Sequence, residues 1–209
     1  MPTYRLIYFN LRARAEAIRL LLAYAGIDYI DDRISRDAWP AMKDQMPLKQ
    51  IPVLEIDGKD KIAQSTAILR YLAHQFGMAA KSPLNEAKVD MLGEAVQDAK
   101  QQCREWRVIV VGYVEGDKDA KFKEVVVPVL NNYGTIFERT LKENGTGWLV
   151  GDSITWVDFF AAEFFDKIIT YGDPTALDQF PLVKKHKENV YAIPNVKKYI
   201  DQRPKNTPF

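Results

Sequence analysis

The apolar pattern near the start of the chain predicts a strand followed directly by a helix. Residues 4–9, "YRLIYF", carry β-forming side chains on both alternating sets, which favours an internal strand buried on both faces. The next apolar residues recur at the spacing of one helical face, and these are Ile18, Leu21, Leu22 and Ala25. Gly26 can end that helix in the left-handed conformation. We therefore expect Tyr8 at the C-terminal edge of a strand, where open α/β sheets bind ligands.

A second strand and a hairpin are expected next. Residues 29–34 have the composition of a strand, and residues 37–46, "DAWPAMKDQM", predict an irregular or briefly helical stretch. Residues 51–64, "IPVLEIDGKDKIAQ", predict a hairpin, because Asp57-Gly58 between two apolar runs is a strong turn signal.

A helix and a linker complete the first part of the chain. Helical periodicity runs from Ser65 until Gly77, which can stop the helix. Residues 77–86, "GMAAKSPLNE", have no apolar period and indicate a linker, in which Ser82 and Pro83 suit the N-cap and the first position of a new helix. The expected order up to residue 77 is strand, helix, strand, short helix, two strands and helix.

Beyond the linker the pattern is helical. One helix is expected from Pro83 to about Arg107, and the β-branched run 108–111 is assigned to helix because no partner strand is evident nearby. A later helix has one apolar stripe, made of Leu130, Tyr133, Phe137 and Leu141. Pro128 would kink or start that helix.

The change from a mixed to a helical pattern near residue 80 predicts two domains. We expect an α/β domain over residues 1–79 and an all-α domain over residues 84–209. Within the second domain, Thr155 and Asp158 have the spacing of a capping box, with Thr155 as N-cap and Asp158 returning the bond.

Composition and charge exclude several classes of function. The chain has 209 residues, 47% hydrophobic content, 27% charged residues and a net charge of +1, which is typical of a soluble globular protein. The cations are spread along the chain, so nothing favours nucleic acid or an anionic membrane as a partner. No run approaches the roughly 20 apolar residues of a membrane span, and the start lacks a basic leader, so we expect a cytoplasmic protein.

The chemistry-bearing residues are few. The two histidines, His74 and His186, and the single Cys103 show no metal-ligand spacing, so no metal is expected. Cys103 cannot form an intrachain disulfide, which suits a reducing compartment. Nucleotide-binding glycine motifs and serine-nucleophile signatures are absent from the sequence.

Four features in a fixed order carry a resemblance to a known family. They are Tyr8 with Arg14, Trp39 with Lys43, the run "QIPVLEIDG" and the run "QSTAILRYLA". Together they resemble the cytosolic glutathione transferases, and "YFNLRARAE" with Gln64-Ser65 looks like the sigma class. The resemblance covers nearly the whole chain, and the tail "RPKNTPF" is similar to helminth members. Two departures are Ala13 and Lys49, where many relatives have glycine.

The resemblance implies a thioredoxin-like domain that binds glutathione and an all-helical domain that forms a hydrophobic substrate pocket. In that family the glycyl carboxylate would meet Lys43 and the Trp39 indole. The cysteinyl backbone would pair with Ile51, before a cis Pro52. The γ-glutamyl carboxylate would sit at Ser65 on a helix N-terminus. Further polar contacts are implied for Gln50, Gln64 and, across a homodimer, Asp98.

Tyr8 then acquires a catalytic role, as its hydroxyl would donate a hydrogen bond to the glutathione sulfur and favour the thiolate. Arg14 would keep positive charge near the phenol. The resemblance places five residues in the hydrophobic pocket: Phe9, Ala13, Cys103, Trp106 and Phe209. Each residue also has a plain structural interpretation, such as packing for Trp39, a surface charge for Lys43 and a helix cap for Gln64-Ser65.

The expected reaction is addition of the thiolate to an apolar electrophile. Two alternatives stay open: isomerisation of prostaglandin H to prostaglandin D, which some sigma relatives perform, and a role as a binding or structural protein, since relatives carry haem or serve as lens crystallins. A glutaredoxin-like disulfide reductase is less favoured, because the turn "FNLRAR" has no cysteine to attack a disulfide.

Overall fold

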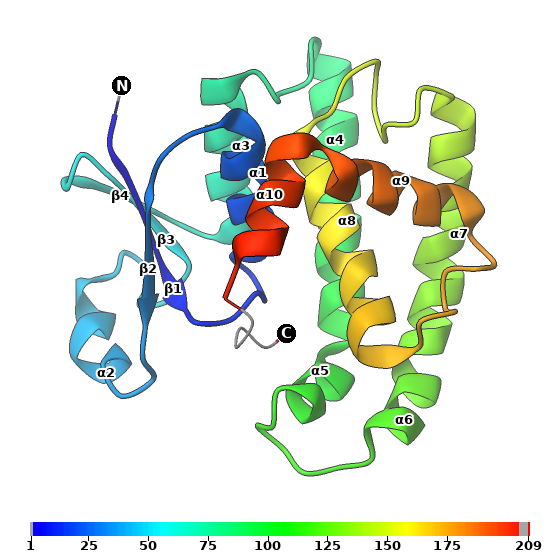
Figure 1. Cartoon of the computed structure of the whole chain (residues 1–209), viewed down its shortest axis with the longest axis horizontal. Coiled ribbons are helices and arrows are strands. Elements are labelled where there is room, and N and C mark those ends of the chain that lie inside the picture. Colours follow the sequence, from blue (N-terminus) through cyan, green and yellow to red (C-terminus); the bar gives the residue numbers. More distant parts are fainter. Residues whose placement is uncertain (1, 205–208) are drawn as a thin grey trace. The chain divides into compact units, whose positions relative to one another are not determined.

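The computed structural model describes residues 2–204 and 209. The chain divides into two compact units (Figure 1). The residues up to Gly77, together with the segment that starts at Pro194, form the unit called here the sheet unit. Met78–Ile193 and Phe209 form the helical unit.

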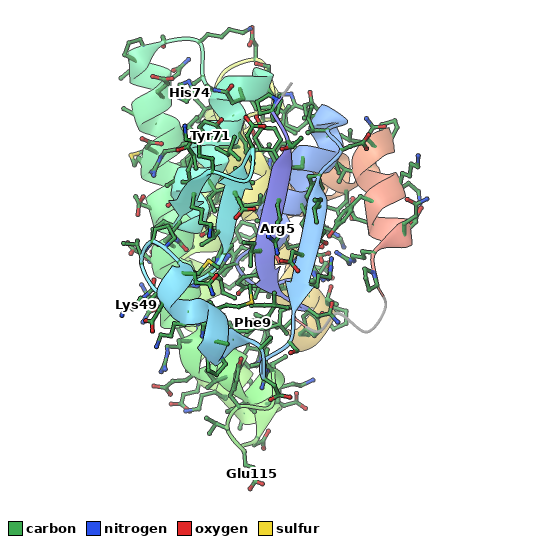
Figure 2. All side chains as sticks on the ribbon, turned by 90° about the vertical axis from the view of Figure 1, so that its left-hand side faces the viewer. Arg5, Phe9, Lys49, Tyr71, His74 and Glu115 are labelled. Carbon is green, nitrogen blue, oxygen red and sulfur yellow. The ribbon has the colours of Figure 1, made fainter. Side chains whose placement is uncertain are left out.

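The sheet unit is built on four strands. They are β1 (Tyr4–Phe9), β2 (Ile30–Ile34), β3 (Val53–Ile56) and β4 (Asp60–Ala63), in the order β2-β1-β3-β4. The β1–β2 pair is parallel, and the β1–β3 and β3–β4 pairs are antiparallel. The expected internal position of the first strand is confirmed, and so is the hairpin around Asp57-Gly58. Arg5, the second residue of β1, forms ion pairs with Asp32 at 2.6 Å and Glu55 at 3.4 Å, one on each neighbouring strand (Figure 2 labels Arg5).

Helices cover both faces of this sheet. They are α1 (Glu16–Ala25), α2 (Trp39–Met42) with a short 3-10 turn (Lys43–Gln45), α3 (Ser65–Phe76) and α10 (Pro194–Gln202). Figure 1 shows α1, α3 and α10 on one face and α2 on the other. Gly26 and Gly77 end α1 and α3 with φ of 66° and 76°, as expected. This is a thioredoxin-like arrangement.

The described residues of the helical unit contain helices and turns but no strand. The elements are α4 (Pro83–Gln102), α5 (Arg104–Val110), α6 (Lys118–Lys121), a π turn (Phe122–Val126), α7 (Val127–Asn144), α8 (Trp156–Lys167), a second π turn (Ile168–Gly172) and α9 (Pro181–Ala192). The all-helical expectation is confirmed. The helical assignment of the β-branched run is confirmed for residues 108–110, where α5 ends, and Val111 follows in a turn.

Two details differ from expectation or refine it. The single helix expected from Pro83 to Arg107 is divided at Cys103, whose ψ of 9° lies outside the α range. Pro128 lies in the first turn of α7, which follows the π turn without a break, because Val126 and Val127 both have right-handed helical backbone angles. Ser82 caps α4 as expected, and its hydroxyl accepts from the Asn85 N–H at 3.3 Å.

The core of the helical unit is α8, whose residues are all buried. Gly93 of α4 lies so close to Trp156 that a β-carbon there would come within 2.2 Å of the indole ring. The carboxylate of Asp158 accepts from the Thr155 N–H at 2.7 Å, which confirms the capping interaction. It also accepts from the Leu149 N–H at 2.9 Å and contacts His186 Nε2 at 2.8 Å.

Helix α10 groups with the sheet unit because buried charges attach it there. The Glu16 carboxylate of α1 is fully buried, and it accepts from the Tyr199 hydroxyl at 3.2 Å and from Arg203 at 2.9 Å. Arg19 pairs with Glu16 at 3.2 Å and with Asp31 at 3.0 Å. The residues 84–209 that were expected to form the second domain therefore include a helix that packs on α1. The boundaries at residues 79 and 84 stay a prediction.

Candidate active site

One edge of the sheet gathers most of the expected binding residues. Ile7 of β1 lies opposite Val53 of β3, and Val53 lies opposite Ala63 of β4. The C-terminal ends of β1 and β4 therefore meet the N-terminal end of β3. The end of the parallel strand β2 lies at the same edge, where Phe9 is in register with Ile34. Loops and a helix N-terminus converge there, as at ligand-binding edges of open sheets.

Tyr8 lies at this edge with only 6% of its surface exposed. Its phenol oxygen accepts a hydrogen bond from the Arg14 backbone N–H at 3.4 Å. Ala13 lies in the turn between β1 and α1 and has a positive φ of 31°. An oxygen that accepts this bond can still donate its own proton to a further group. The Arg14 side chain is exposed beside the turn.

An apolar cluster packs beside this edge of the sheet. Its buried members are Ile7, Ile34, Met46 and Val53, and the partly buried residues packed against them are Phe9, Trp39, Met42, Ile51 and Ala63. The rings of Phe9 and Trp39 meet edge to face, with centroids 6.0 Å apart (Figure 2 labels Phe9 at the end of β1). The packing interpretation of Trp39 is thus part of the structure, and it holds the α2 segment in place at this edge.

Two backbone features stand next to Tyr8. The Ile51–Pro52 peptide bond is cis, as the resemblance implied. Gln64 has φ of 74° and ψ of 118°, a strained conformation for a residue with a side chain. It directly precedes Ser65, which is 2% exposed and opens α3. The first N–H groups of this helix have no intrahelical partner and favour an anion.

The remaining polar residues of the edge are exposed. Lys43 follows α2, and Gln50 precedes the cis bond. Lys49 has φ of 52°, and its ammonium contacts Asp44 at 2.8 Å. The edge therefore offers two cations from separate loops, Arg14 and Lys43, around a buried phenol and a helix N-terminus. That set of groups suits a peptide-like ligand with carboxylates and a thiol.

Four of the expected site residues belong to the helical unit. Asp98 is exposed on α4. Cys103 is 5% exposed, and burial raises the pKa of its thiol to about 12, so it stays protonated and is unsuited to act as a nucleophile. Trp106 and Phe209 are 1% and 4% exposed, and their rings are in contact, with centroids 5.5 Å apart.

Sequence reasoning missed three residues around that pair. Phe122 and Tyr171 contact Trp106 and Phe209 respectively, and Lys167 lies over the Phe209 ring. They come from two segments, around residue 122 and over residues 167–171, that are both distant in sequence from the pair they contact, so no local pattern could have found them. We call Trp106, Phe122, Tyr171, Phe209 and Lys167 the aromatic cluster.

The part of the chain that the structure describes contains no group of three or more His, Cys, Asp or Glu side chains placed to hold a metal. Across the same residues, no helix is both long enough and apolar enough to cross a membrane. His186 is buried against Asp158, which gives it a structural role.

The fold and the site define a class of protein. The glutathione transferase fold consists of a thioredoxin-like unit, with a buried tyrosine at its ligand-binding edge, and an all-helical unit. Family models agree along the chain. The model of the N-terminal domain of glutathione S-transferase matches residues 4–74, and that of its C-terminal domain matches residues 104–203.

Known proteins resemble the chain over its whole length. It is 42% identical to probable glutathione S-transferase 9 of Caenorhabditis elegans, with 98% of each chain covered. A structure described as a monomeric glutathione S-transferase of the hookworm Necator americanus superposes with a TM-score of 0.93 at 41% identity, over 98% of each chain. A Nu-class enzyme of Haemonchus contortus gives 0.87 at 43% identity, again over 98% of each chain.

A more distant neighbour is prostaglandin synthase D of Nilaparvata lugens, with a TM-score of 0.83 at 30% identity over 97% of this chain and 98% of that one. The chain belongs to the glutathione S-transferase family, and it is an enzyme of that family.

Proposed function

We propose that the protein conjugates the thiolate of glutathione to apolar electrophiles. The observation that carries the proposal is the buried Tyr8 hydroxyl at the sheet edge, held by the Arg14 N–H at 3.4 Å and next to the start of α3. Glutathione brings two carboxylates, an ammonium and a thiol. The edge offers a partner for each except the ammonium, which we assign to Asp98 below.

The carboxylates and backbone of glutathione have distinct partners in this proposal. Lys43 and the indole N–H of Trp39 bind the glycyl carboxylate. The cysteinyl backbone adds as a strand beside Ile51, next to Pro52. The γ-glutamyl carboxylate binds the Ser65 hydroxyl and the N–H groups that open α3. Gln50 and Gln64 add neutral hydrogen bonds.

Tyr8 is the catalytic residue, because its hydroxyl donates to the glutathione sulfur. A hydrogen bond to a charged partner contributes roughly 1.5 to 3 kcal/mol, and one pKa unit corresponds to about 1.36 kcal/mol. A thiol with a pKa near ~8.5 would then fall to about 6.3–7.4 and be substantially ionised at neutral pH. Arg14 supports the thiolate by keeping positive charge near it.

We further propose a sigma-like, cytoplasmic enzyme that works as a homodimer. The motif "YFNLRARAE" supports the class, although the similar structures include a Nu-class enzyme. The hookworm structure described as monomeric makes the dimer a point to test.

Replacement of Tyr8 tests the mechanism. Tyr8→Phe should lose most of its turnover, on the order of tenfold or more, while glutathione still binds, because only a bond to the developing anion is removed. The ultraviolet thiolate band of bound glutathione is titrated against pH, and its apparent pKa should rise by about 1–2 units in the variant.

Tyr4→Phe is the matched control, since Tyr4 lies on the same strand and is also buried. It should leave the thiolate pKa unchanged. An equal thiolate pKa in wild type and Tyr8→Phe would remove Tyr8 from the mechanism.

A second candidate reaction is the isomerisation of prostaglandin H to prostaglandin D with the same thiolate. The similarity to prostaglandin synthase D of Nilaparvata lugens supports it. Initial rates with a panel of electrophiles that includes prostaglandin H would decide, and absence of prostaglandin D among the products would exclude it. Binding of haem stays a prediction from resemblance alone.

A further inference from the structure

The turn between β1 and α1 carries the group that binds the Tyr8 phenol. The turn spans residues 10–15, and its Arg14 N–H donates to the Tyr8 oxygen at 3.4 Å. That distance is long for an N–H···O hydrogen bond, so a small displacement of the turn would break the bond. The catalytic role proposed for Tyr8 therefore depends on what holds this turn in place.

Two arginines hold the start of the turn at consecutive residues. Arg19 of α1 donates through Nη1 to the Leu11 carbonyl oxygen at 2.7 Å. Arg33 of β2 donates through Nη1 to the side-chain oxygen of Asn10 at 2.9 Å. Arg33 also lies in register with Tyr8 on the neighbouring strand. Helix α1 and strand β2 thus each direct one guanidinium at the turn.

One carboxylate joins these two arginines. Asp31 of β2 accepts from Arg19 Nε at 3.0 Å through one oxygen and from Arg33 Nε at 2.7 Å through the other. The Arg19 side chain is fully buried and the other two are mostly buried, so water and salt screen these ion pairs less than surface pairs. A guanidinium is planar and rigid, so a partner that fixes its Nε also fixes the direction of its Nη1.

We propose that Asp31 is a positioning residue for catalysis: through the two arginines, it holds the Arg14 N–H against the Tyr8 phenol. The bond that Tyr8 accepts polarises its O–H and leaves the proton free to be donated to a further group. In the proposed function that group is the glutathione sulfur, so this inference rests on the proposed function. Arg19 also contacts Glu16 at 3.2 Å, and loss of Asp31 should therefore loosen the turn without releasing it.

The sign of the effect separates positioning from simple electrostatics. A nearby anion disfavours a thiolate, so neutralisation of Asp31 would by charge alone lower the pKa of the bound thiol. Loss of positioning acts in the opposite direction, because a weaker bond from Arg14 makes Tyr8 a weaker donor to the sulfur. The network therefore predicts that the thiol pKa rises when this carboxylate is neutralised.

Asp31→Asn makes the change with little alteration of shape. The amide keeps one acceptor oxygen but turns an NH₂ group toward the second arginine. The ultraviolet thiolate band of bound glutathione is titrated against pH. Its apparent pKa should rise by about 0.3–1 unit in Asp31→Asn, the equivalent of one weakened hydrogen bond.

Asp32→Asn is the matched control. Asp32 is the next residue of β2 and lies on the opposite face of the sheet. Its side chain is 25% exposed against 23% for Asp31, and it also pairs with an arginine, Arg5, at 2.6 Å. Asp32→Asn should leave the thiolate pKa unchanged. An equal rise in both variants would show a general loss of stability and would overturn the inference.

A double variant tests whether the effect passes through Tyr8. Tyr8→Phe has no hydroxyl for the turn to position, so the further change Asp31→Asn should not raise the thiolate pKa any more. Asn10→Ala is a second and milder variant, because it leaves both ion pairs of Asp31 in place. It should raise the pKa in the same direction, and it tests the network if thermal unfolding shows that Asp31→Asn is not folded.

Several results would reject this role for Asp31. One is a lowered or unchanged thiolate pKa in folded Asp31→Asn, or in Asn10→Ala if the former does not fold. Another is a rise that persists when Tyr8 is already replaced, since Asp31 would then act on the sulfur by another route. Failure of the proposed function gives a different result, namely an equal thiolate pKa in the wild type and Tyr8→Phe.

Discussion

At the residue scale, several residues other than glycine have a positive φ, and two of them are Ala13 and Lys49, with φ of 31° and 52°. The resemblance implied that both are departures from glycine, and the positive φ at each position is a conformation in which glycine carries no strain. A residue with a β-carbon in the left-handed region is destabilised by roughly 1–2 kcal/mol.

Lys49→Gly should therefore stabilise the protein by about 0.5–1 kcal/mol, because relief of the left-handed strain exceeds the entropy cost of glycine. The contact of Lys49 with Asp44 adds little, since the two side chains are 66% and 81% exposed. Chemical denaturation measures the change. Lys59→Gly, the same replacement at an exposed turn residue without positive φ, should be neutral or destabilising. Destabilisation by Lys49→Gly would contradict the strain argument.

Residue-level prediction succeeded where a local pattern carried the information. Tyr8 could be placed at a strand edge because the six residues of β1 have a strand composition and a helix signal follows. The aromatic cluster around Trp106 could not be found this way, because its members come from distant segments. Asp98 and Lys43 are exposed, and their roles in binding stay predictions.

At the element scale, the start of α8 depends on one carboxylate. Asp158 is fully buried and serves three separate segments: the Thr155 N–H, the Leu149 N–H and His186. It therefore caps the helix and also holds the loop before it. The helix cap could be predicted from the sequence, because Thr155 and Asp158 have the spacing of a capping box. The contact with His186 needed the packing of α9 on α8.

Asp158→Ala should lower the free energy of unfolding by about 3–5 kcal/mol, because it leaves buried donors without an acceptor. Asp152→Ala is the control a few residues earlier, where the Lys81 pair is 71% exposed on each side, and it should change stability by less than about 1 kcal/mol. Equal losses in the two variants would show that the buried network contributes nothing beyond a surface pair.

The apolar periodicity predicts some boundaries of the helices and strands but not others. The strands, the first helices and the capped start of α4 could be predicted because turn residues mark their ends. The interruption at Cys103 and the π turn before Val127 could not, because both are backbone adjustments within sequences that have a continuous helical composition.

At the scale of the whole molecule, the proposed dimer gives Asp98 a function. From Ile62 to Asn85 the sequence has no Asp or Glu, so the ammonium of glutathione lacks a carboxylate partner from that segment. Asp98 is exposed on α4, which suits a residue that completes the site of a neighbouring subunit. A two-fold dimer would repeat this contact twice.

Mixing two variants tests this arrangement. Tyr8→Phe and Asp98→Ala subunits are dissociated, combined and reassociated. If Asp98 acts across the interface, a heterodimer has one intact site and one doubly defective site, so activity should exceed that of both parents. No recovery, when exchange is confirmed and each parent is clearly impaired, would place Asp98 in its own subunit's site or outside the site. A mass that shows only monomers would exclude the dimer itself.

The buried carboxylate of Glu16 also has a consequence for biosynthesis. Its partner Arg203 lies 187 residues later in the chain. At about 5–20 residues per second, a ribosome needs roughly 10–40 s to make that interval. Throughout this time Glu16 has its counter-charge from Arg19 of α1 but lacks the two donors near the end of the chain, Tyr199 and Arg203. The first unit to leave the ribosome can thus complete its native contacts only after the sequence of the second has been translated.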